Sequence, residues 1–224
     1  MSAFFVTGTG TDVGKTFIAT GLIHALRRAG REVEALKPLA SGYIAADPSG
    51  DPERLLAALG QDATADAVAA ISPWRFRAPL SPDMAAAREG ASLDVDRVIA
   101  FCGDRVARRR DVLLIEGVGG VMVPLHGRLT VLDWMAALSL PVVLVAGSYL
   151  GTLSHTLTAI TALTARGLEL AALVVNESPG STVDVEETAA TLARFVAEER
   201  IVTLPRLPRP ETVHPAFDRM ARAF

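Results

Sequence analysis

A glycine-rich loop, GTGTDVGKT from Gly8 to Thr16, lies between a short apolar run and a helical pattern. The run Ala3–Val6 is typical of a buried strand, and apolar residues recur at helical spacing from Phe17 until Gly30. A strand, a glycine loop and a helix start in this order direct backbone N–H groups and the positive end of the helix dipole at an anion. The sequence therefore predicts a nucleotide-binding α/β fold.

The loop differs at one position from the usual phosphate-binding sequence G-x-x-x-x-G-K-S/T, because Thr9 stands where the first glycine is expected. It keeps the ammonium group of Lys15, which suits phosphate oxygens, and the hydroxyl of Thr16, which suits Mg²⁺. We therefore predict that a nucleotide binds here together with magnesium. The loop residues expected to hold it are Asp12, Val13, Gly14, Lys15, Thr16 and Phe17.

The lysine content points to the same kind of site. Of the 22 basic residues 20 are arginine, and the two lysines are Lys15 and Lys37. Lys37 ends a strand pattern, Val33–Lys37, so in a parallel sheet it lies at the carboxyl edge, where α/β folds bind ligands. A chain that uses arginine almost everywhere keeps lysine where a compact charge must fit beside a phosphate oxygen. We predict that both lysines are catalytic.

An acidic residue follows another buried strand pattern, Val112–Ile115. Glu116 stands where nucleotide-binding folds place a carboxylate that binds the metal, and the glycines after it let the backbone approach a ligand closely. A lone Glu at a strand end is more often a solvated residue, but the phosphate loop earlier in the chain favours the metal site. The expected contacts are Glu116, Gly117, Val118 and Gly119.

Strand and helix patterns alternate through the rest of the chain. Strands are expected at Pro141–Gly147, Leu170–Asn176 and Arg200–Pro205, and helices at Asp51–Ala70, Asp94–Arg109, Thr152–Ala165 and Val183–Glu199. This alternation is typical of a doubly wound, mostly parallel sheet with helices on both faces. Because no repeat or linker interrupts it, we expect one domain over residues 1–224.

Composition excludes several other classes of protein. The net charge of -3 provides no basic surface for nucleic acid, so no nucleic-acid partner is expected. One cysteine, Cys102, excludes a disulfide framework and is expected to fill a small space in the core. The sequence shows no signal peptide and no apolar stretch of membrane-spanning length. We therefore expect a soluble, cytoplasmic protein without a membrane partner.

Seven motifs occur in an order that resembles one known family. They are GTDVGKT from Gly10, KPLASG from Lys37, SPDMAA from Ser81, EGVGG from Glu116, DW at Asp133, LGTLSHTLT from Leu150 and VVN ending at Asn176. Over almost the whole chain the sequence resembles the dethiobiotin synthetases, ATP-dependent ligases of the penultimate step of biotin biosynthesis. The resemblance implies a P-loop NTPase-like fold, Mg²⁺ as cofactor, and ATP, 7,8-diaminopelargonic acid and CO₂ as substrates.

The family's reaction explains why cations are needed. One amine of the vicinal diamine takes up CO₂ as a carbamate, which attacks the γ-phosphate of ATP to give a carbamic–phosphoric anhydride. The second amine then closes the cyclic urea, dethiobiotin, and ADP and phosphate are released. Carbamate and triphosphate are both anions, so their approach must be offset by positive charge. The resemblance implies that Lys15, Lys37 and magnesium supply that charge.

The resemblance also assigns the remaining site residues. The metal ligands it implies are Thr16, Asp51 and Glu116, with Asp47 and Glu53 as the other acidic candidates near Asp51. Thr11 and Ser41 are expected to position the diamine or carbamate, and Gly151 and Thr152 to receive the substrate carboxylate at a homodimer interface. Adenine and ribose are expected to contact Asn176, Pro205, Arg206, Leu207 and Glu211. For Asp12 two roles stay open, accepting a hydrogen bond from an amine or lying behind the metal ligands.

Two other functions share parts of this pattern. A partitioning-type ATPase switch has the same fold and modified loop, but it carries an additional lysine four residues before Gly14, where this chain has Gly10. A cobyrinate-type amide synthetase shares the ligase chemistry, but it needs an attached glutaminase domain with a cysteine nucleophile. The chain of 224 residues leaves no room for that domain.

Overall fold

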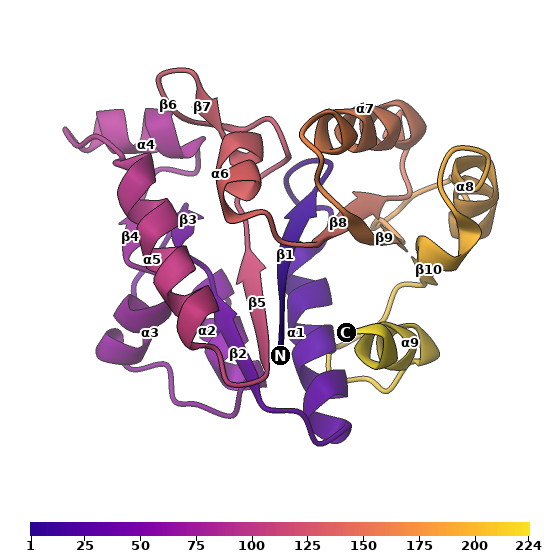
Figure 1. The fold of residues 1–224 in the computed structure, drawn as a ribbon, viewed down its shortest axis with the longest axis horizontal. Helices are drawn as coiled ribbons and strands as arrows, with labels where there is room; N and C mark the ends of the chain where they lie inside the picture. Colours follow the sequence, from indigo (N-terminus) through magenta and orange to yellow (C-terminus); the bar gives the residue numbers. More distant parts are fainter.

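The computed structural model describes residues 1–224 and is built on a six-stranded sheet. The strand order is β10-β9-β8-β1-β5-β2, and every neighbouring pair is parallel (Figure 1). The strands are β1 (Ser2–Gly8), β2 (Val33–Leu36), β5 (Val112–Glu116), β8 (Val142–Gly147), β9 (Leu170–Asn176) and β10 (Ile201–Leu204). The predicted doubly wound α/β fold class is confirmed.

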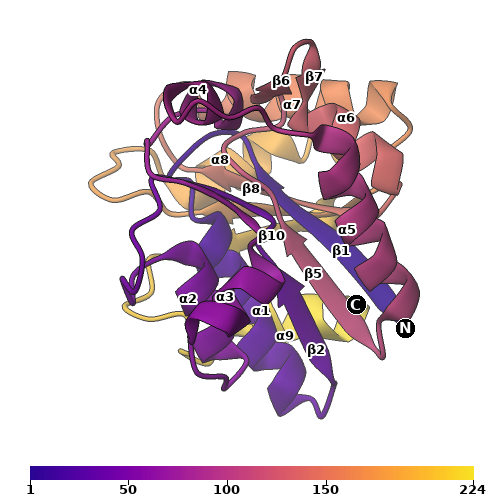
Figure 2. The ribbon, with the colours of Figure 1, turned by 90° about the vertical axis from the view of Figure 1, so that its left-hand side faces the viewer.

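Helices cover both faces of this sheet. The chain crosses from β1 to β2 in one direction and from β5 through β8 to β10 in the other, so right-handed crossovers place their helices on opposite faces. Figure 2 shows α1, α2 and α9 on one side of the sheet and α5 and α6 on the other. The helices are α1 (Lys15–Arg28), α2 (Asp51–Ala58), α3 (Ala65–Ile71), α4 (Pro82–Arg88), α5 (Val95–Arg108), α6 (Val131–Leu138), α7 (Thr152–Ala165), α8 (Val185–Leu192) and α9 (Pro215–Ala223).

Two small strand pairs follow β2 and β5 in the chain. The first is parallel, β3 (Leu39–Ser41) with β4 (Trp74–Phe76), and the second is antiparallel, β6 (Pro124–His126) with β7 (Leu129–Thr130). Neither pair was expected from the sequence. None of the helices combines the length and apolar character that a membrane crossing requires.

The core is one continuous cluster of apolar side chains between the sheet and its helices. Every residue of β5 and β8 is buried, as expected for central parallel strands covered on both faces. Trp134 of α6 packs edge-on against Phe5 of β1, with their ring centroids 4.8 Å apart. Cys102 of α5 is fully buried. Burial raises the pKa of its thiol to about 12, and its contact with Trp134 offsets only part of that rise.

The C-terminal helix packs closely on the helix that begins at the phosphate loop. The ring of Phe217 on α9 lies directly over Gly21 on α1, where a Cβ atom would overlap it. A tilted contact between Phe17 and Phe217 adds to the same interface. The segment that joins β10 to α9 is therefore anchored beside α1.

Two expected helices are shorter than the sequence pattern indicated. The pattern over Asp51–Ala70 is two helices, because Gly60 takes a positive φ of 71° after α2 and Thr64 caps the start of α3. The pattern over Val183–Glu199 is a helix only to Leu192. Beyond it the backbone turns so that Val196 packs into the core, and a short 3₁₀ turn, Glu198–Arg200, leads into β10.

Candidate active site

The phosphate loop connects the carboxyl end of β1 to the start of α1. Gly14 has a φ of 98°, and a Cβ atom there would overlap the side-chain amide of Asn176. That amide donates a hydrogen bond to the carbonyl oxygen of Val13 at 3.0 Å. Glycine is therefore required at position 14 both by the backbone conformation and by the packing of β9 behind the loop.

Lys15 is buried in the loop that it follows. Its Nζ donates to the carbonyl oxygen of Gly10 at 2.8 Å. Burial, together with the nearby charge of Lys37, lowers the pKa of Lys15 to about 8, and the surrounding carboxylates offset only part of this. The loop therefore holds an ammonium group that an anionic ligand would stabilise.

Lys37 reaches the same place from the end of β2, and its Nζ is surrounded by acceptors. They are Glu116 Oε1 at 2.5 Å, Asp51 Oδ2 at 2.8 Å and the carbonyl oxygen of Gly117 at 2.9 Å. Burial by itself would lower the pKa of Lys37, but the two carboxylates outweigh it and the net shift is upward. Lys37 therefore stays charged.

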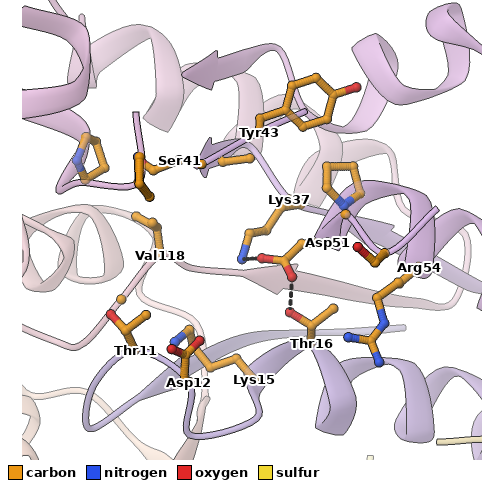
Figure 3. A pocket seen from close by; sticks show the side chains of 18 of the residues that line it. Thr11, Asp12, Lys15, Thr16, Lys37, Ser41, Tyr43, Asp51, Arg54 and Val118 are labelled. Carbon is orange, nitrogen blue, oxygen red and sulfur yellow. Dashed lines mark hydrogen bonds and ion pairs between the residues drawn. The ribbon is translucent and has the colours of Figure 1, made fainter. Parts of the chain in front are cut away.

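Thr16 brings both carboxylates to one point. Its Oγ1 lies 2.7 Å from Asp51 Oδ1 (Figure 3) and 2.7 Å from Glu116 Oε1. A hydroxyl carries one proton and can donate to only one of these oxygens at a time. Glu116 Oε2 is buried and has no hydrogen-bond partner at all. The side chains of Thr16, Asp51 and Glu116 thus bring more hydrogen-bond acceptors to this point than the single Thr16 hydroxyl can satisfy.

The two carboxylates differ in their ionisation. Burial would raise the pKa of Asp51, but the charge of Lys37 and hydrogen bonds from Lys37 and Thr16 outweigh it, so the pKa is lowered. The pKa of Glu116 is raised, because its burial and the charge of Asp51 exceed the stabilisation by Lys37. An additional cation beside Glu116 would therefore favour its ionised form.

Among the three acidic candidates near α2, the structure brings Asp51 to Thr16 and Lys37. Asp47 instead accepts hydrogen bonds from Ser49. Glu53 is buried and accepts from the hydroxyl of Tyr43 at 2.9 Å. The contacts favour Asp51 as the metal ligand, and this assignment stays a prediction.

A cavity of about 910 Å³ opens beside these groups. Its wall includes the oxygen Ser41 Oγ, which is buried without a hydrogen-bond partner. The predicted site residues that line it are Thr11, Asp12, Gly14, Lys15, Thr16, Phe17, Lys37, Ser41, Asp51, Val118 and Gly119 (Figure 3). Parts of the chain from β1 to β5 therefore meet around one space, as the carboxyl edge of a parallel sheet predicts.

The remaining predicted residues lie outside this cavity. Asn176 packs behind the phosphate loop, and Pro205, Arg206, Leu207 and Glu211 belong to the segment between β10 and α9. The backbone N–H of Arg206 donates to Glu177 at 2.8 Å. Their role as a base-binding wall stays a prediction.

Gly151 and Thr152 lie at the start of α7, after β8. Gly151 has a φ of 99°, and the Thr152 hydroxyl donates to the carbonyl oxygen of Gly147 at 2.6 Å. Thr152 is buried, so its hydroxyl holds the turn, and only backbone groups remain to meet a ligand. His155, one turn later, pairs with the hydroxyl of Tyr149 at 2.9 Å. Neither Gly151 nor Thr152 lines the cavity.

Among the polar residues of the cavity wall that sequence reasoning missed are Tyr43 and Arg54. Tyr43 is held by Glu53 and by the guanidinium of Arg75, which lies 5.3 Å from the centre of its ring. Arg54 follows Asp51 by three positions on α2 and so shares its helix face. That spacing was the one signal in the sequence that could have indicated Arg54.

Known proteins resemble this chain along nearly its whole length. A family model described as an AAA domain matches residues 2–213. A protein named ATP-dependent dethiobiotin synthetase BioD from Acidiphilium cryptum is 50% identical over 198 residues, covering 88% of this chain and 89% of the relative. One of the same name from Methylobacterium nodulans is 49% identical over 212 residues, covering 92% and 94%.

A solved structure supports the fold. The septum site-determining protein MinD of Pyrococcus horikoshii OT3, complexed with Mg-ADP, aligns with a TM-score of 0.59 at 16% identity, over 98% of this chain and 94% of that one. At this identity the likeness concerns the fold alone. The curated relatives are far more similar, and with the matching family model they identify the group. The chain belongs to the AAA domain family and, within it, to the ATP-dependent dethiobiotin synthetases.

Proposed function

We propose that this protein converts 7,8-diaminopelargonic acid, CO₂ and ATP into dethiobiotin, ADP and phosphate. The observation that carries the proposal is the convergence of two lysines, two carboxylates and a hydroxyl at the phosphate loop, beside a cavity with room for a second substrate. The names and close similarity of the curated relatives support it.

The reaction proceeds in two covalent steps after carbamate formation. A carbamate oxygen attacks the γ-phosphorus and the bond to ADP breaks, which gives the mixed anhydride. The neighbouring amine then attacks the carbonyl carbon, phosphate leaves with the bonding electrons, and the urea ring closes after the amine loses its proton. The charges of Lys15 and Lys37, which are held at the phosphate loop, would oppose the repulsion between the two anionic reactants.

Mg²⁺ fits the groups around Thr16. A hard cation would bind the oxygens that lack a donor here. They are the unpartnered Oε2 of Glu116 and the carboxylate oxygens of Asp51 and Glu116 that share the Thr16 hydroxyl. No group of three or more His, Cys, Asp or Glu side chains in the structure is arranged so that it could hold a metal ion by itself. The protein would therefore hold the ion through Thr16, Asp51 and Glu116 and leave its other positions to phosphate oxygens and water. When bound, the ion neutralises charge on the phosphates.

Substrate and nucleotide would enter from different sides of the phosphate loop. Thr11 and Ser41 line the cavity and offer hydroxyls to the diamine or carbamate. On the other side, Asn176 and the segment after β10 would enclose adenine and ribose. One N–H of the Asn176 amide already binds the loop, which leaves its other N–H and its oxygen for the base.

A homodimer would complete the substrate site, with the start of α7 facing the partner's cavity. Leu150, next to Gly151, is 93% exposed, which suits a surface that a second copy covers. We expect dilution to the monomer to weaken substrate binding before nucleotide binding, and we expect Leu150→Asp to do the same at higher concentration. Activity assays paired with light scattering measure this. A monomer with full activity would contradict the shared site.

Nucleotide affinity should depend on the ionisation of Lys15. Its pKa is about 8 in the free protein, so the ammonium form is present below pH 8 and must be regained on binding above it. We expect ADP affinity in magnesium-free buffer to be steady below pH 8 and to fall by up to about tenfold per pH unit above it. Calorimetry in buffers of different ionisation heat should show proton uptake above pH 8. Lys15→Gln should remove this uptake, and a wild-type affinity that stays flat to pH 9.5 would contradict the assignment.

The function itself is tested by product formation. The protein is incubated with 7,8-diaminopelargonate, labelled bicarbonate and Mg-ATP, and the label should appear in an acid-stable cyclic urea. Phosphate release should require both the diamine and bicarbonate. Phosphate release without the diamine, stimulated by a protein or membrane partner, would instead support the ATPase switch and overturn the proposal.

A further inference from the structure

The cavity wall contains one arginine, Arg54, whose charge has no partner in the protein. Its side chain is half-buried, yet it makes no ion pair or side-chain hydrogen bond. Several other arginines pair with carboxylates, among them Arg31 with Asp111 at 2.7 Å. A guanidinium carries five N–H donors, and a half-buried one without an acceptor points to an acceptor that comes from outside the chain.

The position of Arg54 on α2 explains why Asp51 does not neutralise it. The two residues share a helix face, but the oxygens of Asp51 are already bonded, Oδ1 to Thr16 and Oδ2 to Lys37. Figure 3 shows the guanidinium extended past Thr16 toward the first turn of α1, on the opposite side of Thr16 from Thr11. Arg54 therefore directs its donors at the place where a phosphate chain would meet the helix start.

Which phosphate lies there follows from the direction of transfer, and this step rests on the proposed function. The phosphoryl group must leave toward the carbamate, that is, toward Thr11 and Ser41. The opposite end of the phosphate chain, which carries the ribose, then lies on the side of Arg54. We propose that Arg54 is a nucleotide-binding residue that donates hydrogen bonds to the α-phosphate of ATP.

A contact at the α-phosphate acts equally on ATP and ADP and is unchanged during phosphoryl transfer. Its loss weakens binding of both nucleotides to the same extent and raises the KM for ATP, while kcat at saturating ATP is preserved. For Arg54→Ala we expect about a tenfold loss of affinity for each nucleotide, as for one charge-assisted contact at a partly exposed site. Arg54→Lys keeps the charge but not the fork, and its affinity should lie between wild type and Arg54→Ala.

The experiment is calorimetric titration of wild type, Arg54→Ala and Arg54→Lys with ADP and with a non-hydrolysable ATP analogue, without diamine. Arg97→Ala is the matched control, because Arg97 is exposed, lies on helix α5 of the other face and has no ion pair. Unchanged affinity in Arg54→Ala would make Arg54 an ordinary surface charge and overturn the proposal. A loss for the ATP analogue alone would place the contact at the γ-phosphate and overturn it equally.

This design separates the inference from the proposed function. If the wild type binds ADP but forms no cyclic urea, the proposed reaction fails, whereas the titrations still decide whether Arg54 contacts a phosphate shared by both nucleotides. Thermal melts of each variant confirm that the protein titrated is folded. A wild type with no affinity for either nucleotide would overturn both.

Discussion

Lys37→Gln is expected to lower kcat by about two to three orders of magnitude, with a smaller effect on ATP binding. Lys37 comes from β2, outside the phosphate loop, and its ammonium group lies among Asp51, Glu116 and the carbonyl of Gly117. In the proposed reaction carbamate and γ-phosphate would meet beside this group, so its charge should matter most while charge moves between them. Steady-state kinetics and nucleotide titration of the variant measure the two effects separately.

Two further variants sharpen this result. Lys15→Gln should damage nucleotide binding as well as turnover, because Lys15 belongs to the loop that is proposed to hold the phosphates before and during transfer. Lys37→Arg should not restore activity, because the position is buried and its acceptors surround a compact ammonium group that a planar guanidinium cannot replace. Near-native kcat in Lys37→Arg would show that Lys37 is an ordinary charge at the sheet edge.

Glu116→Gln is expected to raise the magnesium concentration needed for half-maximal activity and to lower kcat by about two orders of magnitude. The amide keeps the size of the side chain and removes the negative charge that a cation would meet at the unpartnered Oε2. The fold should persist, because Lys37 keeps Asp51 and the carbonyl of Gly117 as partners. The measurement is a magnesium titration of activity at fixed ATP, with a thermal melt of the variant.

The matched control is Asp51→Asn. The side chain of Asp51 is 41% exposed, against 1% for Glu116, so solvent screens the charge of Asp51 more strongly. Removing that charge should therefore also raise the magnesium requirement, but by less than Glu116→Gln does. An unchanged magnesium requirement in Glu116→Gln would remove Glu116 from the metal site. A larger effect at Asp51 would reverse the proposed ranking of the two ligands.

The sequence predicted the sheet because its strands are buried on both faces. Runs such as Val112–Ile115 are apolar at every position, and such runs are readable without knowing their neighbours. The pairs β3–β4 and β6–β7 were missed because strands of two or three residues have too little pattern of their own and are fixed by tertiary contacts. The split between α2 and α3 was missed although Gly60 marks it, because the alanine-rich composition continues on both sides.

Site residues were predictable where chemistry restricts the residue type. Lys15, Thr16 and Glu116 occupy positions defined by a strand end and a loop, and the structure brings them together. Arg54 was harder to identify, because its spacing of three from Asp51 is the one signal that distinguishes it from the other arginines until α2 is placed against α1. The roles proposed for Asn176 and Gly151 stay predictions, because they involve a bound nucleotide and a second copy of the chain.

Because Cys102 is buried, its chemical modification can be used to measure how often the core of the protein opens. Alkylating reagents attack the thiolate, and a fully buried thiol with a pKa of about 12 is almost entirely protonated at neutral pH and out of reach. Modification at this single cysteine therefore requires α5 to separate from the sheet, by local or global unfolding. The rate at which the chain gains one adduct mass then reports how often the core opens. A ligand that binds only the closed form slows this rate by the same factor by which it lowers the open population, that is, exponentially in the stability it adds.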